Sequence, residues 1–326
     1  MTAALVLAKA ERPKVSLQVV VGERSDLHKV THGTERPQRL DTDRIVATRQ
    51  IALLSRAWEK YGFAEAEAGF AALAAELARR EPPPGDLLDE AKRLRRLSAA
   101  FAAWDRFEFA LAAHELNALR GKAPSVGRYL DAARLLRQQE TWEPPVLLDL
   151  WRNAERRAAR GQYDDAVSRC YRLIEWTAQW LLRRYHGIET ARIPAQLVPE
   201  EISGPARPSA AGTLKLGLTQ AWQLLMLLEP DCPAARAMRR NEGGTKTMFE
   251  VMKDHLQARN ASFLAHGFAP IGRDKWLKFG GWMADRFMPV LRAEARGAGA
   301  ADDLPQLPTD PALFPAAGMA AVGHDR

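Results

Sequence analysis

One stretch decides the fold of this chain: residues 161–187, which read GQYDDAVSRCYRLIEWTAQWLLRRYHG. Its apolar and aromatic residues recur at the spacing of one helix face, which is formed by Val167, Tyr171, Ile174, Ala178 and Leu181. The pattern predicts a long helix over residues 164–186 with this face in the core. Gly187 is the expected end of the helix, because glycine readily adopts the left-handed conformation found there.

Further helices are predicted on both sides of this stretch. Trp142-Glu143-Pro144-Pro145 marks a boundary, and Pro145 suits the first turn of a helix over residues 146–160. After a proline-rich loop over residues 187–212, the expected helices cover residues 213–228, 247–265 and 273–296. Residues 144–297 are therefore predicted to be an all-helical bundle. The Ala/Gly/Pro-rich residues 298–326 are predicted to be a disordered tail.

Residues 41–143 have helical patterns and a weak internal repeat. An aromatic residue, a small residue one turn later and a bulky residue one turn beyond it occur three times, at Phe63/Ala66/Phe70, Phe109/Ala112/Leu116 and Tyr163/Ala166/Cys170. This spacing lets the two helices of a hairpin pack closely. Because the repeats start 46 and 54 residues apart, the sequence predicts helix hairpins rather than a regular solenoid.

Residues 1–40 follow a different pattern. Residues 2–10 predict a short Ala-rich helix, and residues 16–22 have the apolar run of a buried strand. Residues 23–40 are polar and loop-like, with room for one edge strand. One helix and one strand cannot bury a parallel strand alone, so this segment predicts that the chain begins inside an α/β domain. The expected fold class is mainly α, with an α/β remnant at the N-terminus.

Composition limits the class of protein. The chain has 326 residues, 47% of them hydrophobic, which is enough for two domains with sizeable cores. There is no run of eighteen apolar residues, so no membrane span is expected. Two cysteines, Cys170 and Cys232, predict neither a disulfide framework nor a zinc site, and a cytoplasmic protein is expected. The net charge of +7 is compatible with a polyanionic partner.

The candidate chemistry lies in Arg259-Asn260-Ala261-Ser262-Phe263-Leu264-Ala265-His266, followed by Gly267. Seven steps of about 100° place Arg259 and His266 nearly in line on a helix. His255 and Ser262 share this polar face, beside an apolar stripe of Phe249, Met252, Leu256, Phe263 and Leu264. An arginine that holds a phosphate, an amide that orients it and a titratable imidazole suffice to cut RNA without a metal. The alternative is a solvent-facing helix end at which His266 caps the last carbonyl groups.

Two neighbouring features have simpler interpretations. Asp254 adjoins His255, but adjacent helix residues point about 100° apart, so Asp254 is expected in solvent. Gly243-Gly244-Thr245-Lys246 has the composition of a phosphate-binding loop, but no strand is predicted before it. A turn between two helices is the expected structure there.

The sequence around these residues resembles the HEPN ribonuclease domain of the CRISPR-associated CARF–HEPN ancillary nucleases of type III systems. The resemblance covers most of residues 1–290 and rests on residues 161–180, on Tyr185-His186-Gly187-Ile188 and on residues 259–268. It implies a HEPN-like domain over residues 144–297 and, in residues 1–40, the truncated remnant of a Rossmann-like CARF domain. In that family the CARF domain binds cyclic oligoadenylate through a loop that would precede Met1. We therefore expect this chain to bind that activator weakly or not at all.

The resemblance also implies a mechanism. Two HEPN domains pair in a homodimer, in which one His266 helps to remove the 2′-hydroxyl proton of single-stranded RNA and the other assists the leaving oxygen. Arg259 would hold the scissile phosphate and Asn260 would orient it, with no metal or other cofactor, while His255 and Ser262 are candidates for substrate binding. The competing function is a catalytically inactive helical adaptor that binds nucleic acid or a protein partner.

Overall fold

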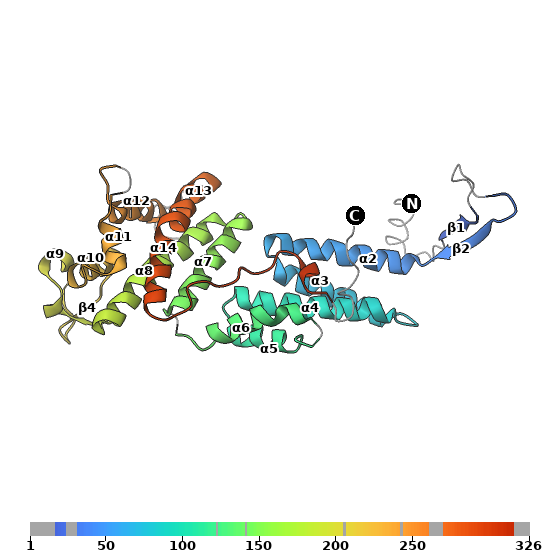
Figure 1. Cartoon of the computed structure of the whole chain (residues 1–326), viewed down its shortest axis with the longest axis horizontal. Coiled ribbons are helices and arrows are strands. Elements are labelled where there is room, and N and C mark those ends of the chain that lie inside the picture. The colour runs from blue at the N-terminus through green and yellow to red at the C-terminus, as the bar shows by residue number, and fades with distance from the viewer. Residues whose placement is uncertain are drawn as a thin grey trace. The chain divides into compact units, whose positions relative to one another are not determined.

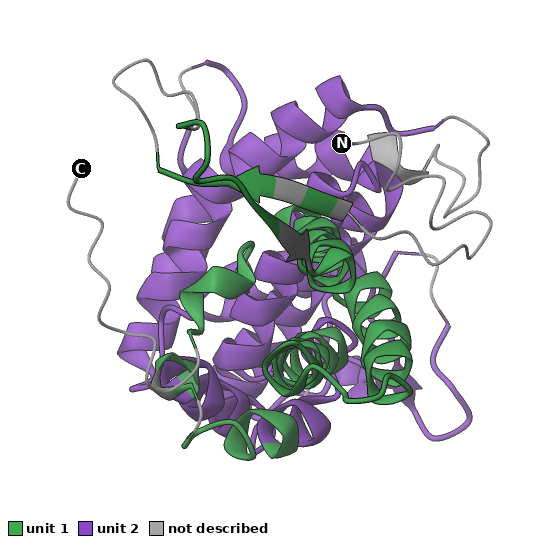
Figure 2. Cartoon of the chain, turned by 90° about the vertical axis from the view of Figure 1, so that its right-hand side faces the viewer, with its two compact units in different colours: residues 1–103, 114–126, 308–326 green, residues 104–113, 127–307 purple. Residues whose placement is uncertain are grey.

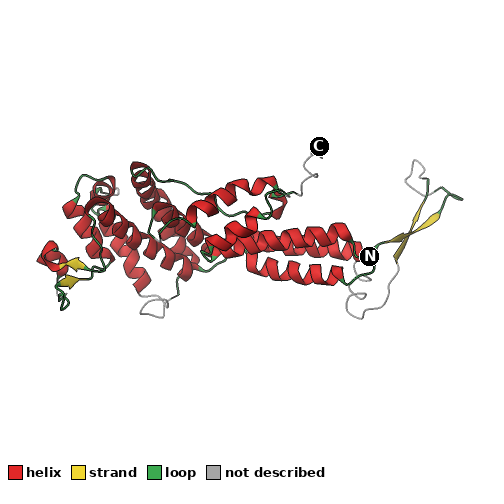
Figure 3. Cartoon of the chain, turned by 90° about the horizontal axis from the view of Figure 1, so that it is seen from below, coloured by secondary structure: helices red, strands yellow, loops and turns green. Residues whose placement is uncertain are grey.

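The computed structural model describes residues 17–23, 31–121, 123–140, 142–204, 207–241, 244–260 and 270–315 of the 326-residue chain. Within these residues the fold is mainly α-helical, as predicted, and the strands form two short antiparallel pairs (Figure 3). The chain divides into two compact units (Figure 2), which comprise residues 1–103, 114–126 and 308–326 (unit 1) and residues 104–113 and 127–307 (unit 2). The domain boundaries predicted at residues 40, 143 and 297 stay a prediction.

Unit 1 consists of a two-stranded ribbon followed by helices. In chain order the elements that lie in it wholly or in part are β1 (Leu17–Val21), β2 (Arg36–Leu40), α2 (Thr42–Ser55), the 3-10 helix η1 (Arg56–Lys60), α3 (Phe63–Ala78), α4 (Gly85–Asp105), α5 (Phe109–Asn117) and the short 3-10 helices η2 (Pro124–Val126) and η5 (Pro311–Leu313). Helices α4 and α5 contribute residues to both units.

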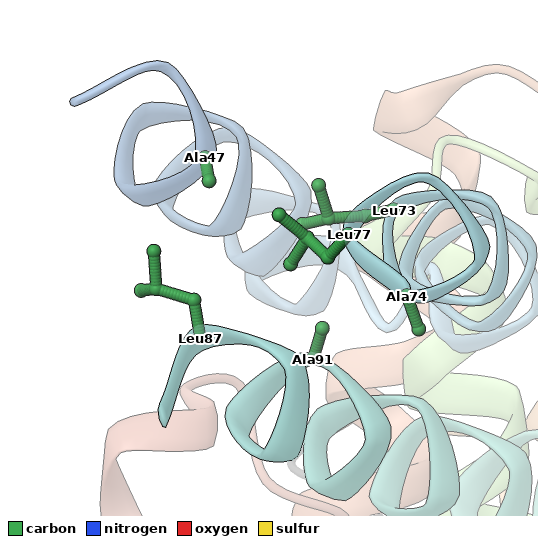
Figure 4. Close-up of a cluster of buried hydrophobic side chains, with 6 residues drawn as sticks. All are labelled: Ala47, Leu73, Ala74, Leu77, Leu87 and Ala91. Carbon is green, nitrogen blue, oxygen red and sulfur yellow. The ribbon is translucent and has the colours of Figure 1, made fainter. Parts of the chain in front are cut away.

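One hydrophobic cluster of unit 1 joins α2, α3 and α4. Figure 4 shows Leu73 and Leu77 of α3 pointing toward α2 and α4, where Ala47, Leu87 and Ala91 meet them. Small residues on α2 and α4 allow this close approach, and each buried leucine stabilises the fold by about 1.5–3 kcal/mol. The three-helix arrangement therefore follows from alternating small and large side chains in the sequence.

The three predicted repeats share a turn geometry. Each begins a helix, at Phe63 of α3, at Phe109 of α5 and at the first residue of α8 (Tyr163–His186). Two positions before each start lies a residue with positive φ: Tyr61 at 56°, Phe107 at 64° and Gly161 at 76°. The left-handed residue ends one helix and redirects the chain into the next. The predicted hairpins are thus confirmed as three similar helix–turn–helix junctions.

The ribbon at the N-terminus corrects one prediction. Strand β1 pairs antiparallel with β2, from Leu17 opposite Leu40 to Val21 opposite Arg36. Val20 and Val21 are 59% and 39% exposed, so the expected buried strand is wrong. A two-stranded ribbon leaves side chains in solvent unless a second layer covers them. The described part of residues 1–40 therefore does not show the expected Rossmann-like remnant.

Unit 2 is a helical bundle (Figure 1). Its further elements are α6 (Gly127–Leu136), α7 (Pro144–Ala159), α8, β3 (Ile193–Pro194), η3 (Ala195–Leu197), α9 (Glu200–Ser203), β4 (Thr213–Leu214), α10 (Leu218–Leu228), α11 (Pro233–Arg239), α12 (Met248–Asn260), α13 (Arg273–Trp282), the π-helical turn η4 (Met283–Phe287) and α14 (Met288–Gly297). No helix in the described ranges is both long and apolar enough to cross a membrane.

Helix α8 agrees with its prediction, whereas a later helix begins further along the chain than predicted. Gly187 ends α8 with φ 66°, and Val167, Ile174, Ala178 and Leu181 on the predicted face are buried. The helix expected over residues 213–228 instead begins at Leu218, because β4 pairs with β3 and Gly217 is extended. The predicted helix over residues 273–296 is confirmed, with the π-helical turn η4 inside it.

The C-terminal segment corrects a second prediction. Residues 298–315 are described, and three apolar side chains spaced along them are buried: Leu304, Leu307 and Phe314. In unit 2, Gln306 accepts a hydrogen bond from the Arg156 guanidinium at 2.9 Å. In unit 1, the Phe314 ring lies 5.6 Å from that of Phe101. The predicted disorder is therefore wrong for these residues, because the buried anchors outweigh the Ala/Gly/Pro-rich composition around them.

Candidate active site

Helix α12 carries the first two residues of the candidate motif. The backbone N–H of Thr247 donates to Glu250 Oε2 at 2.7 Å, and the N–H of Glu250 donates to Thr247 Oγ1 at 3.3 Å. This reciprocal pair is a capping box, and it fixes where the helix begins. The hydrogen bond from the Thr247 backbone also lowers the pKa of Glu250. The start of the motif-bearing helix is thus encoded by a Thr-x-x-Glu sequence.

The inner face of α12 anchors the helix in unit 2. Phe249, Met252 and Leu256 are at most 9% exposed, which confirms the described part of the predicted apolar stripe. Phe263 and Leu264, the rest of that stripe, lie outside the described residues. Helix α12 contacts both α8 and α11. Its position in the bundle is therefore set by apolar contacts that precede the motif.

Arg259 and Asn260 are the last residues of α12, and their side chains lie outside the described part of the chain. Ser262 and His266 fall in residues 261–269, which are also outside it. The arrangement of Arg259, Asn260, Ser262 and His266 stays a prediction.

His255 is the one predicted site residue whose side chain is described. Its ring lies 5.0 Å from the ring of Phe279, in a stacked arrangement, and 5.4 Å from that of Trp282. Phe279 and Trp282 are buried residues of α13. Packing between α12 and α13 is therefore sufficient to explain His255, one turn before Arg259, and substrate contact by this residue stays a hypothesis.

The chain is fixed again where it leaves the motif. The backbone N–H of Ile271 donates to the Asp164 carboxylate, at 3.2 Å and 3.3 Å to its two oxygens, and Ile271 is buried. Asp164 lies in the first turn of α8, where a carboxylate also faces the positive end of the helix dipole. Sequence reasoning missed this contact: the acidic first turn is visible in the sequence, but its partner 107 residues later is not.

A buried carboxylate of α14 joins three helices of the bundle. Glu294 is 1% exposed and accepts hydrogen bonds from the Tyr185 hydroxyl at 2.8 Å and from the Ala234 backbone N–H at 2.9 Å. The Arg184 guanidinium lies 3.2 Å away and supplies the opposite charge. Ala234 lies in the first turn of α11, and α11 contacts α12. The hydrogen bonds of Glu294 therefore hold a helix against which the motif-bearing helix packs.

The described part of the Gly-Gly-Thr-Lys segment, residues 244–246, contains no strand and leads into α12. Asn241 and Thr247 pair as an isolated antiparallel bridge on either side of it. Lys246 Nζ lies 2.6 Å from Asp254 Oδ2, and both side chains are more than half exposed. The prediction that Asp254 lies in solvent is confirmed. Among the described residues, no group of three or more His, Cys, Asp or Glu side chains is placed to hold a metal ion.

One comparison with known proteins gives a match in this region. Residues 135–285 match the family model described as Csm6 HEPN domain. No curated protein matches the chain. The matched residues contain α7, α8, α12 and α13, together with Arg259, Asn260 and His266. The match supports a CRISPR-associated HEPN family for this part of the chain.

Proposed function

We propose that the protein is an endoribonuclease that cleaves single-stranded RNA by attack of a 2′-hydroxyl group. The observation that carries this proposal is the match of residues 135–285 to the Csm6 HEPN domain, because the matched part contains the Arg-Asn-x5-His sequence. At the level of the family, the match suggests a CRISPR-associated HEPN ribonuclease. The residues that we assign to the reaction are Arg259, Asn260 and His266.

The reaction needs a base, an acid and a group that stabilises negative charge. One His266 takes the proton from the 2′-hydroxyl, whose oxygen then forms a bond to the adjacent phosphorus. The bond from phosphorus to the 5′-oxygen breaks, and a second His266 returns a proton to that oxygen. Arg259 remains protonated and stabilises the charge that develops on the phosphate. The products are a 2′,3′-cyclic phosphate and a free 5′-hydroxyl.

The described contacts support a rigid frame for this chemistry. Leu256 anchors α12 just before the motif, and the Ile271–Asp164 hydrogen bonds hold the chain just after it. A reactive group must be held close to its productive geometry, because a misplacement of about 1 Å can cost roughly 100-fold in rate. Control by cyclic oligoadenylate belongs to this proposal only for a chain that carries a complete CARF domain.

We expect a homodimer, because each chain supplies one His266 and the reaction needs two imidazoles. Light scattering of the full chain at micromolar concentration should give twice the chain mass of 36.3 kDa. Mixing wild-type chains with an excess of His266→Ala chains should then reduce cleavage through mixed dimers. A stable monomer that still cleaves RNA would rule out the shared site.

We also expect cleavage that does not depend on a divalent metal. In-line attack by a 2′-hydroxyl requires only base, acid and a clamp for the phosphate, and DNA lacks that hydroxyl. Labelled single-stranded RNA and its DNA analogue should be incubated with the full chain in excess chelator. The RNA should be cut to a cyclic-phosphate end and the DNA should stay intact. Loss of activity in chelator with recovery on addition of magnesium contradicts the mechanism, whereas RNA binding without any cleavage indicates the adaptor.

A further inference from the structure

Helix α13 presents exposed cations directly after the candidate motif. Its first six residues are Arg273, Asp274, Lys275, Trp276, Leu277 and Lys278, and their net charge is +2 from three cations and one carboxylate. Lys275 and Lys278 are both exposed and lie one turn apart on the helix. We call these two residues the α13 lysine pair.

The α13 lysine pair differs from many other cations of unit 2. The unit 2 arginines that lie within 4 Å of a carboxylate include Arg152, Arg172, Arg183, Arg192 and Arg296. Neither lysine of the pair has such a partner in the described part of the chain, although Asp274 and Asp285 lie on the same helical segment. Asp274 and Asp285 therefore do not neutralise the positive charge of the pair, which remains available to attract an anionic ligand.

Position links the pair to the candidate site. His255 of α12 stacks on Phe279 of α13, which fixes one point where the two helices meet. Arg259 follows His255 by one turn, and Lys275 precedes Phe279 by one turn. Arg259 and Lys275 therefore both lie on the side of the His255–Phe279 contact where α12 ends and α13 begins. On α13, Lys275 also continues the row of Phe279 and Trp282, the two residues that contact His255.

We propose that the α13 lysine pair binds backbone phosphates of the RNA strand beside the scissile position. This proposal rests on the proposed nuclease function and adds the residues that hold the substrate. A lysine is a compact point charge on a long flexible stem, which suits a phosphate and carries no base preference. Two lysines one turn apart can meet two phosphates of the same strand. The contacts release counterions, so their contribution to affinity falls as salt concentration rises.

The test compares Lys275→Gln/Lys278→Gln with the wild-type full chain. Binding is measured by fluorescence anisotropy on a single-stranded RNA that carries 2′-O-methyl groups throughout, which blocks cleavage. Two phosphate contacts contribute a slope of about 1.4 to the dependence of log Kd on log salt concentration. Between about 50 and 200 mM salt, the affinity of the wild type should therefore fall about sevenfold more than that of the variant.

The control is Lys60→Gln/Lys92→Gln, which removes two exposed lysines from unit 1 and changes the net charge by the same amount. Its salt dependence should match that of the wild type, and thermal melting should show that both variants fold. The proposal would be overturned if both variants showed an equal reduction in the salt dependence of RNA binding, or if Lys275→Gln/Lys278→Gln showed none. Lysine-dependent binding to anionic lipid vesicles without lysine-dependent binding to RNA would overturn it as well.

The outcomes also separate this proposal from the nuclease function. If the wild type cleaves unmodified RNA and the lysine variant keeps the same KM and salt dependence, the RNA surface is wrong and the nuclease stands. If the wild type binds RNA through the pair but does not cleave it, the surface stands and the nuclease is wrong.

Discussion

Replacement of His266 by alanine is expected to lower the rate of RNA cleavage by at least about 100-fold, because general acid–base catalysis contributes roughly 10²–10⁴ to such reactions. In a homodimer the substitution removes both imidazoles at once, so neither the attacking hydroxyl nor the leaving oxygen has its proton-transfer group. Binding of a non-cleavable RNA should change little, since Arg259 and the α13 lysine pair remain. The measurement is the single-turnover rate on a labelled RNA, together with Kd for the 2′-O-methyl RNA.

Stability separates a catalytic role of His266 from a structural one. We expect a change of roughly 0.5 kcal/mol or less, as for a surface residue at a helix end. His114→Ala is the matched control, because His114 is an exposed histidine of α5 that we assign no chemistry. It should leave both the cleavage rate and the thermal midpoint unchanged. If His266→Ala cleaves at the wild-type rate in preparations free of other nucleases, His266 is not part of the site, and a large fall in midpoint instead supports the helix-end interpretation.

Local patterns were enough to predict the helices that bury a regular face. Helix α8 shows this, because its apolar spacing and the glycine after it both depend only on neighbouring residues. The same holds for the junctions at Phe63, Phe109 and Tyr163, whose aromatic–small–bulky spacing reflects close packing of two helices. Each of these patterns lies within about two helical turns, so one amino-acid sequence is enough to predict it.

Features that depend on distant partners were missed. The prediction extended a helix back through residues 213–217, but Leu214 pairs with Ile193 in a short strand instead. The apolar run of β1 predicts burial, yet its described partner is the polar strand Arg36–Leu40. Burial and strand pairing are set by what lies opposite in space. The local sequence therefore predicted a strand correctly at β1 and its environment wrongly.

The candidate site also combines features that local sequence predicts with features that depend on distant contacts. The capping box at Thr247 and the inner face of α12 depend on local sequence, whereas the bond from Ile271 to Asp164 joins segments 107 residues apart. Spacing alone also placed His255 on the polar face of the motif. The structure adds that its ring packs on Phe279, because a histidine offers an aromatic face as well as a titratable nitrogen. This contact with α13 gives His255 a packing role that its position on α12 alone does not predict.

A buried charge network in unit 2 gives the second large expected effect. The Arg156 side chain of α7 is fully buried, and its Nε donates to Asp105 Oδ1 at 2.7 Å. Asp149, also fully buried, lies 3.5 Å from the same guanidinium and accepts a hydrogen bond from Trp104 Nε1 at 2.9 Å. Burial raises the pKa of Asp149, because it disfavours the charged form of the carboxyl group. Arg156 supplies the positive charge that both carboxylates share, and the Arg157 guanidinium also pairs with Asp105 Oδ2 at 2.7 Å.

Replacement of Arg156 by methionine is expected to destabilise the protein by about 3–5 kcal/mol, because it leaves the fully buried Asp149 without its counter-charge and Asp105 with Arg157 alone. A unit of this size should then lose roughly 6–20 °C in thermal midpoint. The control is Arg152→Met on the same helix, since Arg152 pairs with the partly exposed Glu155 and the exposed Asp303 and should contribute about 1 kcal/mol or less. If the two variants melt within a few degrees of each other, Arg156 does not hold the network together. A second substitution, Asp149→Asn, should restore part of the stability lost in Arg156→Met, because it removes the buried charge left without a partner while its amide oxygen can still accept from Trp104.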